Sequence, residues 1–337
     1  MVKDFKHVQT AHCENGVITS LLQHQGLNFM TEPLAFGMGA GLFYIHVPFF
    51  KVNGGPMVSF RTMPGWIFNK TCKSLNVELD RRKFKDQISA EKYLDQKVSE
   101  GIPVGCQVGV YNLTYFPKEY RFHFNAHNLI VYGKENDKYL ISDPVMEELT
   151  CLSKNELNKV RFAQGVLAPK GHLYYPKKIG KIDKTVIRKA IISGINRNII
   201  LMSKAPGSIV GTTGIKRTAK QIRTWRDKLG VRKAGLYLGQ IVRMQEEIGT
   251  GGGGFRFLYA AFLEQAAGHL SEDKLMPISD QFTKAGDLWR SSAVQMAGIY
   301  KRRLTEQKDF DHVADIMTEI SAVEKKAFKD LSKLKLK

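Results

Sequence analysis

A cysteine stands immediately ahead of the first segment with helical periodicity. Residues 14–25 carry three aliphatic side chains at helical spacing, and Gly26 stands where a helix would stop. A thiol at the start of a helix feels the positive end of the helix dipole and unpaired backbone N–H groups, which favour the thiolate. The same N–H groups could face the oxyanion that forms when sulfur attacks an acyl carbon. Cys13 is therefore a candidate nucleophile, and the alternative is a small buried core residue.

A histidine and an aspartate fall at the open end of a predicted β-hairpin. Residues 127–133 and 138–144 are short, rich in strand-forming residues and separated by a polar turn. A turn centred near residue 135 puts His127 opposite Asp143, where facing Cβ atoms are about 4.5–5.5 Å apart. Asp143 would fix the imidazole tautomer, and His127 would take the thiol proton and return it to the leaving group. The alternative is a buried sheet histidine and an aspartate that starts an Asp-Pro turn.

The order of these three residues along the chain resembles that of papain-like cysteine proteins. In those proteins a helix-borne thiol meets a sheet-borne histidine and the carboxylate or amide that orients it. Such enzymes form a thioester with an acyl group and pass it to water or to an amine. The resemblance implies an α+β N-terminal domain in which Cys13, His127 and Asp143 form the catalytic triad.

A closer resemblance lies in a series of motifs near the N-terminus, namely His12–Cys13, Leu21–Leu22, Gly26, Thr31–Glu32 and the FGMGAG run at 36–41. These motifs, with the later FNAHNLIVYGKENDKYLISDP, resemble the N-terminal domain of the butirosin-biosynthesis acyltransferase family. The resemblance covers roughly residues 7–170. In the namesake, an acyl group on an acyl carrier protein moves to an amine of an aminoglycoside. For this chain the resemblance implies acyl transfer through Cys13 without fixing the substrate.

Four other residues are candidates for oxyanion or substrate binding. Gln9 precedes the thiol by four residues, and papain-like proteins often place an oxyanion-hole glutamine upstream, at a longer spacing. Glu32 precedes a proline and could hydrogen-bond near the site. Gly37 and Gly39 could let the backbone approach a thioester or pantetheine arm. For the glutamate and the glycines, the alternative is a role in a structural turn.

Metal and cofactor chemistry have little support in the pattern. A zinc site built from His12, Cys13, His123 and His127 is conceivable, but these residues lack tight ligand spacing. The four cysteines form no CxxC pair, so neither a disulfide framework nor a zinc ribbon is indicated. We therefore expect no metal and no cofactor.

Periodicity divides the chain into a mixed half and a helical half. Strands are expected at 104–111, 127–133 and 138–144, and a second helix at 89–100 with Ser89 as its cap. Residues 168–181, rich in Pro, Gly and Lys, are typical of a linker. Beyond them, apolar spacing predicts helices near 182–195, 217–247, 255–268, 281–305 and 310–335. The expected fold class is α+β, with a papain-like domain over 1–172 and a basic, mostly helical domain over 173–337.

Composition excludes several classes of protein. With 337 residues, 43% hydrophobic and 25% charged, the chain is too ordinary for a disordered or fibrous protein and long enough for two domains. Residues 33–50 approach membrane length, but their prolines and glycines favour a buried core segment over a spanning helix. The N-terminus has no apolar stretch typical of a secretory signal. A cytoplasmic protein is expected.

The net charge of +19 is concentrated in one segment. Residues 177–243 contain 17 Lys and Arg against Asp183 and Asp227, a net of +15, whereas residues 244–337 hold 14 of each sign. Such a field attracts an acidic partner. For an acyltransferase we expect that partner to be an acidic acyl carrier protein or acyl-CoA, with a small molecule as acceptor. The alternative is ordinary solvated helix faces.

Three functions are consistent with these features of the sequence. The first is acyl transfer from a thioester donor to an amine or hydroxyl through Cys13. The second is a cysteine amidase or peptidase, since the same triad serves both and exclusion of water chooses the acceptor. The third is a nucleic-acid or membrane-surface binding protein without catalysis. Nucleic acid is not expected, because the basic segment has only Trp225 and Tyr237 as large stacking side chains, whereas single-strand binders interleave many.

Overall fold

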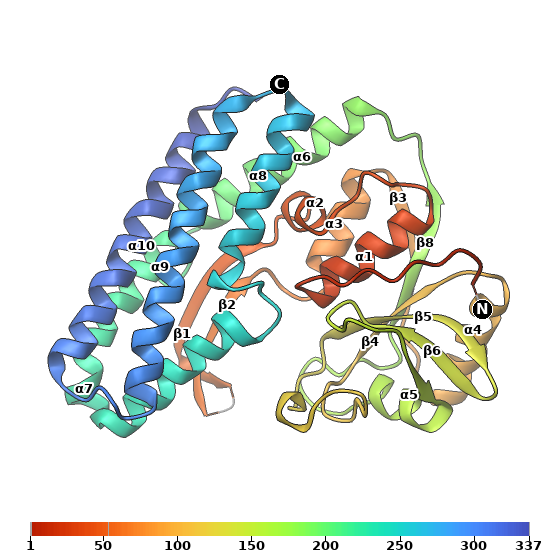
Figure 1. Cartoon of the computed structure of the whole chain (residues 1–337), viewed down its shortest axis with the longest axis horizontal. Helices are drawn as coiled ribbons and strands as arrows, with labels where there is room; N and C mark the ends of the chain where they lie inside the picture. The colour runs from red at the N-terminus through yellow and green to blue at the C-terminus, as the bar shows by residue number, and fades with distance from the viewer. Residues whose placement is uncertain (1, 53, 337) are drawn as a thin grey trace. The chain divides into compact units, whose positions relative to one another are not determined.

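The computed structural model describes residues 2–52 and 54–336, which group into two units. Unit 1 comprises Met1–Ala35 and Ile67–Ile182, and unit 2 comprises Phe36–Trp66 and Asp183–Lys337. Unit 1 combines an antiparallel sheet with several helices and unit 2 is mostly helical, which confirms the α+β class (Figure 1). The expected division into residues 1–172 and 173–337 differs from these units in two segments. Residues 36–66 group with the later helices, and residues 173–182 group with the earlier sheet.

Unit 1 is built on a six-stranded antiparallel sheet with the order β3-β8-β4-β5-β6-β7. Its strands are β3 (Val77–Arg82), β4 (Val104–Val108), β5 (His127–Glu135), β6 (Lys138–Ser142), β7 (Thr150–Ser153) and β8 (Leu173–Ile179). Its helices are α1 (Cys13–His24), α3 (Trp66–Ser74, whose first residue groups with unit 2), α4 (Gln87–Ser99), α5 (Lys154–Arg161) and a 3₁₀ turn at Lys118–Tyr120.

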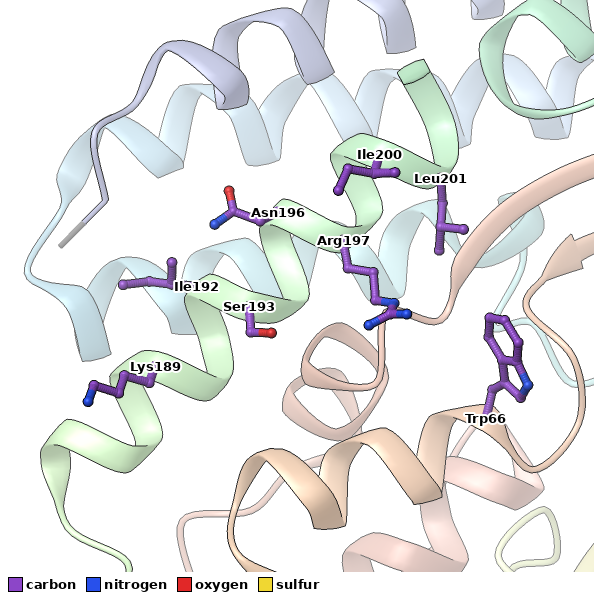
Figure 2. A pocket seen from close by; sticks show the side chains of 8 residues that line it. All are labelled: Trp66, Lys189, Ile192, Ser193, Asn196, Arg197, Ile200 and Leu201. Carbon is purple, nitrogen blue, oxygen red and sulfur yellow. The ribbon is translucent and has the colours of Figure 1, made fainter. Parts of the chain in front are cut away.

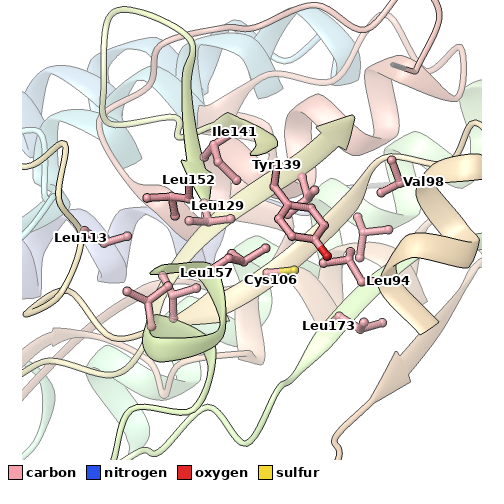
Figure 3. Close-up of a cluster of buried hydrophobic side chains, with 14 of the residues drawn as sticks. Leu94, Val98, Cys106, Leu113, Leu129, Tyr139, Ile141, Leu152, Leu157 and Leu173 are labelled. Carbon is pink, nitrogen blue, oxygen red and sulfur yellow. The ribbon is translucent and has the colours of Figure 1, made fainter. Parts of the chain in front are cut away.

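The two faces of this sheet bury different helices. Cys106 on β4 belongs to an apolar core that α4 and α5 cover with Leu94 and Leu157 (Figure 3). Its neighbour Gly105 points to the opposite face, where a Cβ would lie 3.0 Å from Val17 of α1. Helix α1 therefore lies on the sheet face away from that core, and the sheet positions the residue at which α1 begins.

Two local predictions in unit 1 are wrong. Residues 173–179 form an inner strand rather than part of a linker, because Leu173, Tyr174 and Tyr175 are buried and outweigh the Pro and Lys content. The proline that follows them sits beside a register shift in the β3–β8 pairing, where a missing N–H is tolerated. Helix α4 begins two residues earlier than expected, with the Asp86 side chain accepting from the Ser89 N–H.

Unit 2 is mostly helical. Its helices are α2 (Glu32–Met38, shared with unit 1), α6 (Lys184–Ile199), α7 (Gly211–Val242), α8 (Arg256–Leu270), α9 (Met276–Tyr300) and α10 (Gln307–Lys333). One hairpin joins them, β1 (Leu42–Val52) with β2 (Gly55–Arg61). In its core the buried Arg256 guanidinium contacts both carboxylate oxygens of Glu324 at 2.8 and 2.9 Å, and the Trp289 indole also donates to that carboxylate. Across the described ranges, no helix is both long and apolar enough to cross a membrane.

Candidate active site

Cys13 is the first residue of helix α1 and is 7% exposed. The preceding His12 caps the helix, since its Nδ1 accepts from the Asn15 N–H at 3.4 Å. The Glu32 carboxylate accepts the backbone N–H groups of Ala11 and His12 at 2.9 and 2.7 Å. Glu32 therefore fixes the chain directly ahead of the thiol, a structural contact that the sequence could only suggest.

Burial of the Glu32 carboxylate disfavours its charged form. Burial raises the pKa of its carboxyl group, and the two backbone hydrogen bonds partly offset that rise. A Glu32→Gln substitution would keep the size but leave one backbone N–H with a poorer acceptor. We expect the free energy of unfolding to fall by about 1–3 kcal/mol, measured by urea titration. Glu119→Gln, at an exposed site, is the matched control, and an equal loss there would contradict the contact's importance.

His127 and Asp143 form a buried pair. His127 Nε2 lies 2.7 Å from Asp143 Oδ2, and both residues are at most 5% exposed. The register behind this contact differs from the predicted one. Asn136 and Asp137 both have positive φ, so the hairpin turns on these two residues rather than around residue 135. Ile130 therefore lies opposite Ser142, and Asp143 meets the histidine from the turn after β6 rather than as a facing strand residue.

The protonation of His127 follows from its surroundings. Burial lowers the pKa of the imidazole, but the Asp143 charge, the Cys13 sulfur and hydrogen bonds to both outweigh it and raise the pKa to about 10. Because Nε2 faces Asp143, Nδ1 is the ring nitrogen left for the thiol. The imidazole is thus protonated at neutral pH in this arrangement and can stabilise a neighbouring anion.

Tyr115 is a member of this cluster that the sequence did not reveal. Its hydroxyl donates to Asp143 Oδ2 at 2.7 Å, while the Val145 N–H donates to the other carboxylate oxygen at 3.2 Å. Burial and the nearby Asp143 charge raise the pKa of Tyr115, so it remains a donor. The aspartate is therefore held by a histidine, a tyrosine and the backbone, and its orientation is fixed.

Removing the Tyr115 hydroxyl tests its positioning role. In Tyr115→Phe we expect the alkylation rate of Cys13 to fall about tenfold at neutral pH, since one charge-assisted hydrogen bond is lost. The pH profile of labelling should shift as well, which a purely packing role would not cause. The measurement is iodoacetamide labelling followed by mass spectrometry. Tyr120→Phe, whose side chain is exposed, is the control and should leave the profile unchanged.

Asn128 is a second residue that sequence reasoning missed. Its side-chain Nδ2 lies 4.0 Å from Cys13 Sγ and donates to the Ala126 carbonyl at 3.1 Å. Its Oδ1 accepts from the Tyr174 hydroxyl at 2.9 Å, so the amide has one fixed orientation. The available signal was a polar asparagine directly after His127 in an otherwise apolar strand. An amide donor beside the sulfur can polarise a bound carbonyl or stabilise a thiolate.

The remaining predicted site residues have different surroundings. Gln9 is exposed in the segment ahead of α1, whose Thr10 N–H donates to the Pro144 carbonyl at 2.6 Å. In unit 2, a Cβ at Gly37 would lie 2.1 Å from the Phe262 ring, so this glycine permits close helix packing. Gly39 is buried just after α2.

The zinc alternative receives no support from side-chain clustering. His123 is exposed and stacks on Tyr111 with ring centroids 4.2 Å apart, whereas His12 caps α1. Within residues 2–52 and 54–336, no group of three or more His, Cys, Asp or Glu side chains could hold a metal ion.

Comparison with known families assigns both parts of the chain. The family described as "Butirosin biosynthesis protein H, N-terminal" matches residues 12–144, which include Cys13, His127 and Asp143. The family described as "Domain of unknown function (DUF4872)" matches residues 155–331, more than half of the chain. No curated protein matched the sequence. The chain therefore belongs to the DUF4872 family, and the part that precedes this match is similar to the N-terminal domain of butirosin biosynthesis protein H.

Proposed function

We propose that the protein is an acyltransferase that carries its acyl group as a thioester on Cys13. The single observation that supports this most is the buried His127–Asp143 contact of 2.7 Å beside a thiol at the first residue of α1. The match to butirosin biosynthesis protein H supports acyl transfer as the reaction class. The proposed donor is a thioester and the proposed acceptor is an amine or hydroxyl of a small molecule.

The proposed chemistry has two balanced steps. His127 takes the Cys13 proton, the sulfur attacks the donor carbonyl carbon, the C–S bond to the donor breaks, and His127 returns the proton to the departing thiolate. The acceptor nitrogen or oxygen then attacks the Cys13 thioester, its proton passes to His127, and the Cys13 sulfur leaves. Asp143 keeps the imidazole oriented in both steps. Backbone N–H groups of the first turn of α1 and the Asn128 amide are the proposed donors to the oxyanion.

An anionic donor suits the charge of unit 2. Within this unit, residues 183–243 contain 14 Lys and Arg against two Asp, a net of +12, and acyl carrier proteins and acyl-CoA are both acidic. Along α6 a cavity of about 680 Å³ combines Lys189 and Arg197 with aliphatic side chains and the Trp66 indole (Figure 2). Cations beside an apolar wall suit a ligand with phosphate and alkyl parts. We therefore propose an acyl carrier protein or acyl-CoA as the donor.

The proposal is tested with acetyl-CoA and with the acetyl thioester of N-acetylcysteamine as probes. Intact-mass spectrometry should show one acetyl group on the protein, and peptide mapping should place it on Cys13. Adding a panel of primary amines should discharge it as an amide. Release as free acetate at the same rate with and without amines would favour the hydrolase alternative. No acyl adduct from any acyl-CoA or acyl carrier protein thioester would overturn the proposed function.

A further inference from the structure

The tip of the β1–β2 hairpin carries two exposed phenylalanines. Phe49 is 82% exposed and Phe50 is 56% exposed. Val47 pairs with Met57 and Lys51 with Pro56, so the three β1 residues between these pairs bulge out of the ladder. Two large apolar side chains on a projecting bulge add nothing to the core of unit 2 and indicate burial against something else.

Two other elements of unit 2 reach the same place. A Cβ at Gly55, beside the hairpin turn, would lie 3.0 Å from Gln240 of α7, and a Cβ at Gly239 would lie 2.9 Å from the Tyr300 ring at the end of α9. The hairpin turn, the C-terminal part of α7 and the end of α9 therefore adjoin at one end of unit 2 (Figure 1). Leu236 of α7 and Tyr300 are 53% and 49% exposed there.

The same three parts of unit 2 also carry exposed cations. The three elements contribute six exposed basic residues, namely Lys51, Arg232, Lys233, Lys301, Arg302 and Arg303. Over the described ranges, none of the six forms an ion pair with a carboxylate. Two carboxylates from the same stretches of chain, Asp227 and Glu306, pair instead with Arg226 and Lys308. We name the six cations with Phe49, Phe50, Leu236 and Tyr300 the hairpin-end surface.

We propose that the hairpin-end surface binds an anionic lipid bilayer. Phe49 and Phe50 would enter the boundary between headgroups and acyl chains, where aromatic rings are favoured. The six cations would lie at the level of the anionic headgroups, whose surface potential attracts them. The acyl-transfer proposal does not require this contact, which would place the enzyme at a membrane where amphipathic acceptors or donors reside.

The arrangement favours a bilayer over other acidic partners. A nucleic-acid duplex would satisfy the cations but leave the two phenylalanines in water. Binders of single strands distribute several stacking aromatics along a groove, whereas Phe49 and Phe50 adjoin on one bulge. An acidic protein would need an apolar pocket for the tip in addition to its charges. A fluid interface provides both kinds of contact without a shaped pocket.

The test is co-sedimentation of the full chain with vesicles. We expect binding to vesicles of phosphatidylcholine mixed with phosphatidylserine, weak binding to phosphatidylcholine alone, and loss of binding as salt is raised. Phe49→Ser with Phe50→Ser should weaken binding about tenfold or more, and Arg302→Glu with Arg303→Glu should weaken it as well. The matched controls are Ile88→Ser and Lys83→Glu with Lys85→Glu, which change exposed residues of unit 1.

The outcomes separate this proposal from the acyltransferase. Cys13→Ala should bind vesicles as the wild type does, so loss of catalysis and loss of membrane binding are distinguishable. Absence of binding to phosphatidylserine vesicles would overturn the proposal. So would binding that the hairpin and arginine variants leave unchanged. Tight binding to duplex DNA, RNA or an acyl carrier protein that depends on Phe49 and Phe50, without vesicle binding, would assign the surface to that partner instead.

Discussion

Cys13→Ala is expected to lower the rate of acyl transfer by at least about a thousandfold, because the covalent intermediate can no longer form. Cys13→Ser should be nearly as inactive, since a hydroxyl is a far weaker nucleophile than a thiol. Both variants should lose the acyl adduct in intact-mass spectra. The residual rate would come from binding and from the oxyanion donors alone.

The other cysteines supply the controls for this experiment. Burial raises the pKa of Cys72 and of Cys106, so both thiols are poor nucleophiles, and Cys151 is exposed on β7. Cys151→Ala should therefore transfer acyl groups at the wild-type rate and carry the same adduct. Transfer that survives in Cys13→Ala but fails in Cys151→Ala would mean that the nucleophile lies on β7.

Many of the helices and strands could be predicted from the sequence pattern, and the elements that were missed have local causes. The α1 and α4 segments were predicted within a few residues from helical spacing and stop signals, and β5 and β6 from short runs of strand-forming residues on either side of a polar turn. The β1–β2 hairpin was not predicted, since residues 42–61 mix glycines and prolines with strand residues and include a bulge. Strand β8 was missed for the same reason. Its pairing partners, β3 and β4, lie far away in the sequence, and local pattern carries no information about them.

The principal residues of the candidate site could be predicted from the sequence, but the residues that hold them in place could not. Cys13, His127 and Asp143 have recognisable types and chain order, and the hairpin joins the last two even with a shifted register. Tyr115 reaches Asp143 from a loop 28 residues away in sequence, with no period or motif to mark it. Contacts of this kind depend on where a loop lies after folding.

A glycine in α1 shows how a residue type can indicate such a contact. A Cβ at Gly16 would lie 2.4 Å from the Pro144 side chain and 2.1 Å from the Thr10 hydroxyl. The missing side chain therefore lets the first turn of α1 approach the turn that begins with Asp143. Glycine in a helix interior lowers stability by about 1 kcal/mol relative to alanine. At position 16, the close approach of Pro144 and Thr10 explains why glycine stands there despite this cost.

His127→Ala is expected to slow iodoacetamide labelling of Cys13 by about tenfold or more at neutral pH, because the protonated imidazole that stabilises the sulfur anion is removed. In the wild type, Cys13 should be labelled faster than Cys151, the exposed cysteine on β7. The measurement is the second-order rate constant at each cysteine across a pH series, followed by mass spectrometry.

The same pair predicts how stability changes with pH. The folded-state pKa of His127 is raised from 6.5 to about 10, so its stabilisation is fully present below 6.5 and is lost as pH rises toward about 10. Asp143→Asn removes the charge that holds the proton. The free energy of unfolding of the wild type should therefore exceed that of Asp143→Asn by about 3 kcal/mol near pH 6, and the difference should shrink through this window.

His172 provides the matched control, because it is a buried histidine with the opposite shift. Burial and the nearby Arg81 and Lys83 charges lower the pKa of His172 to about 3, so this histidine is neutral in the folded protein throughout the range from pH 6.5 to 10. Its Nδ1 lies 3.0 Å from Gln107 Oε1, outside the Cys13 cluster. His172→Ala should cost stability by the same amount at every pH between 6.5 and 10 and leave labelling of Cys13 unchanged. Equal slowing of Cys13 labelling in the two histidine variants would show that packing, rather than the imidazolium charge, controls the thiol.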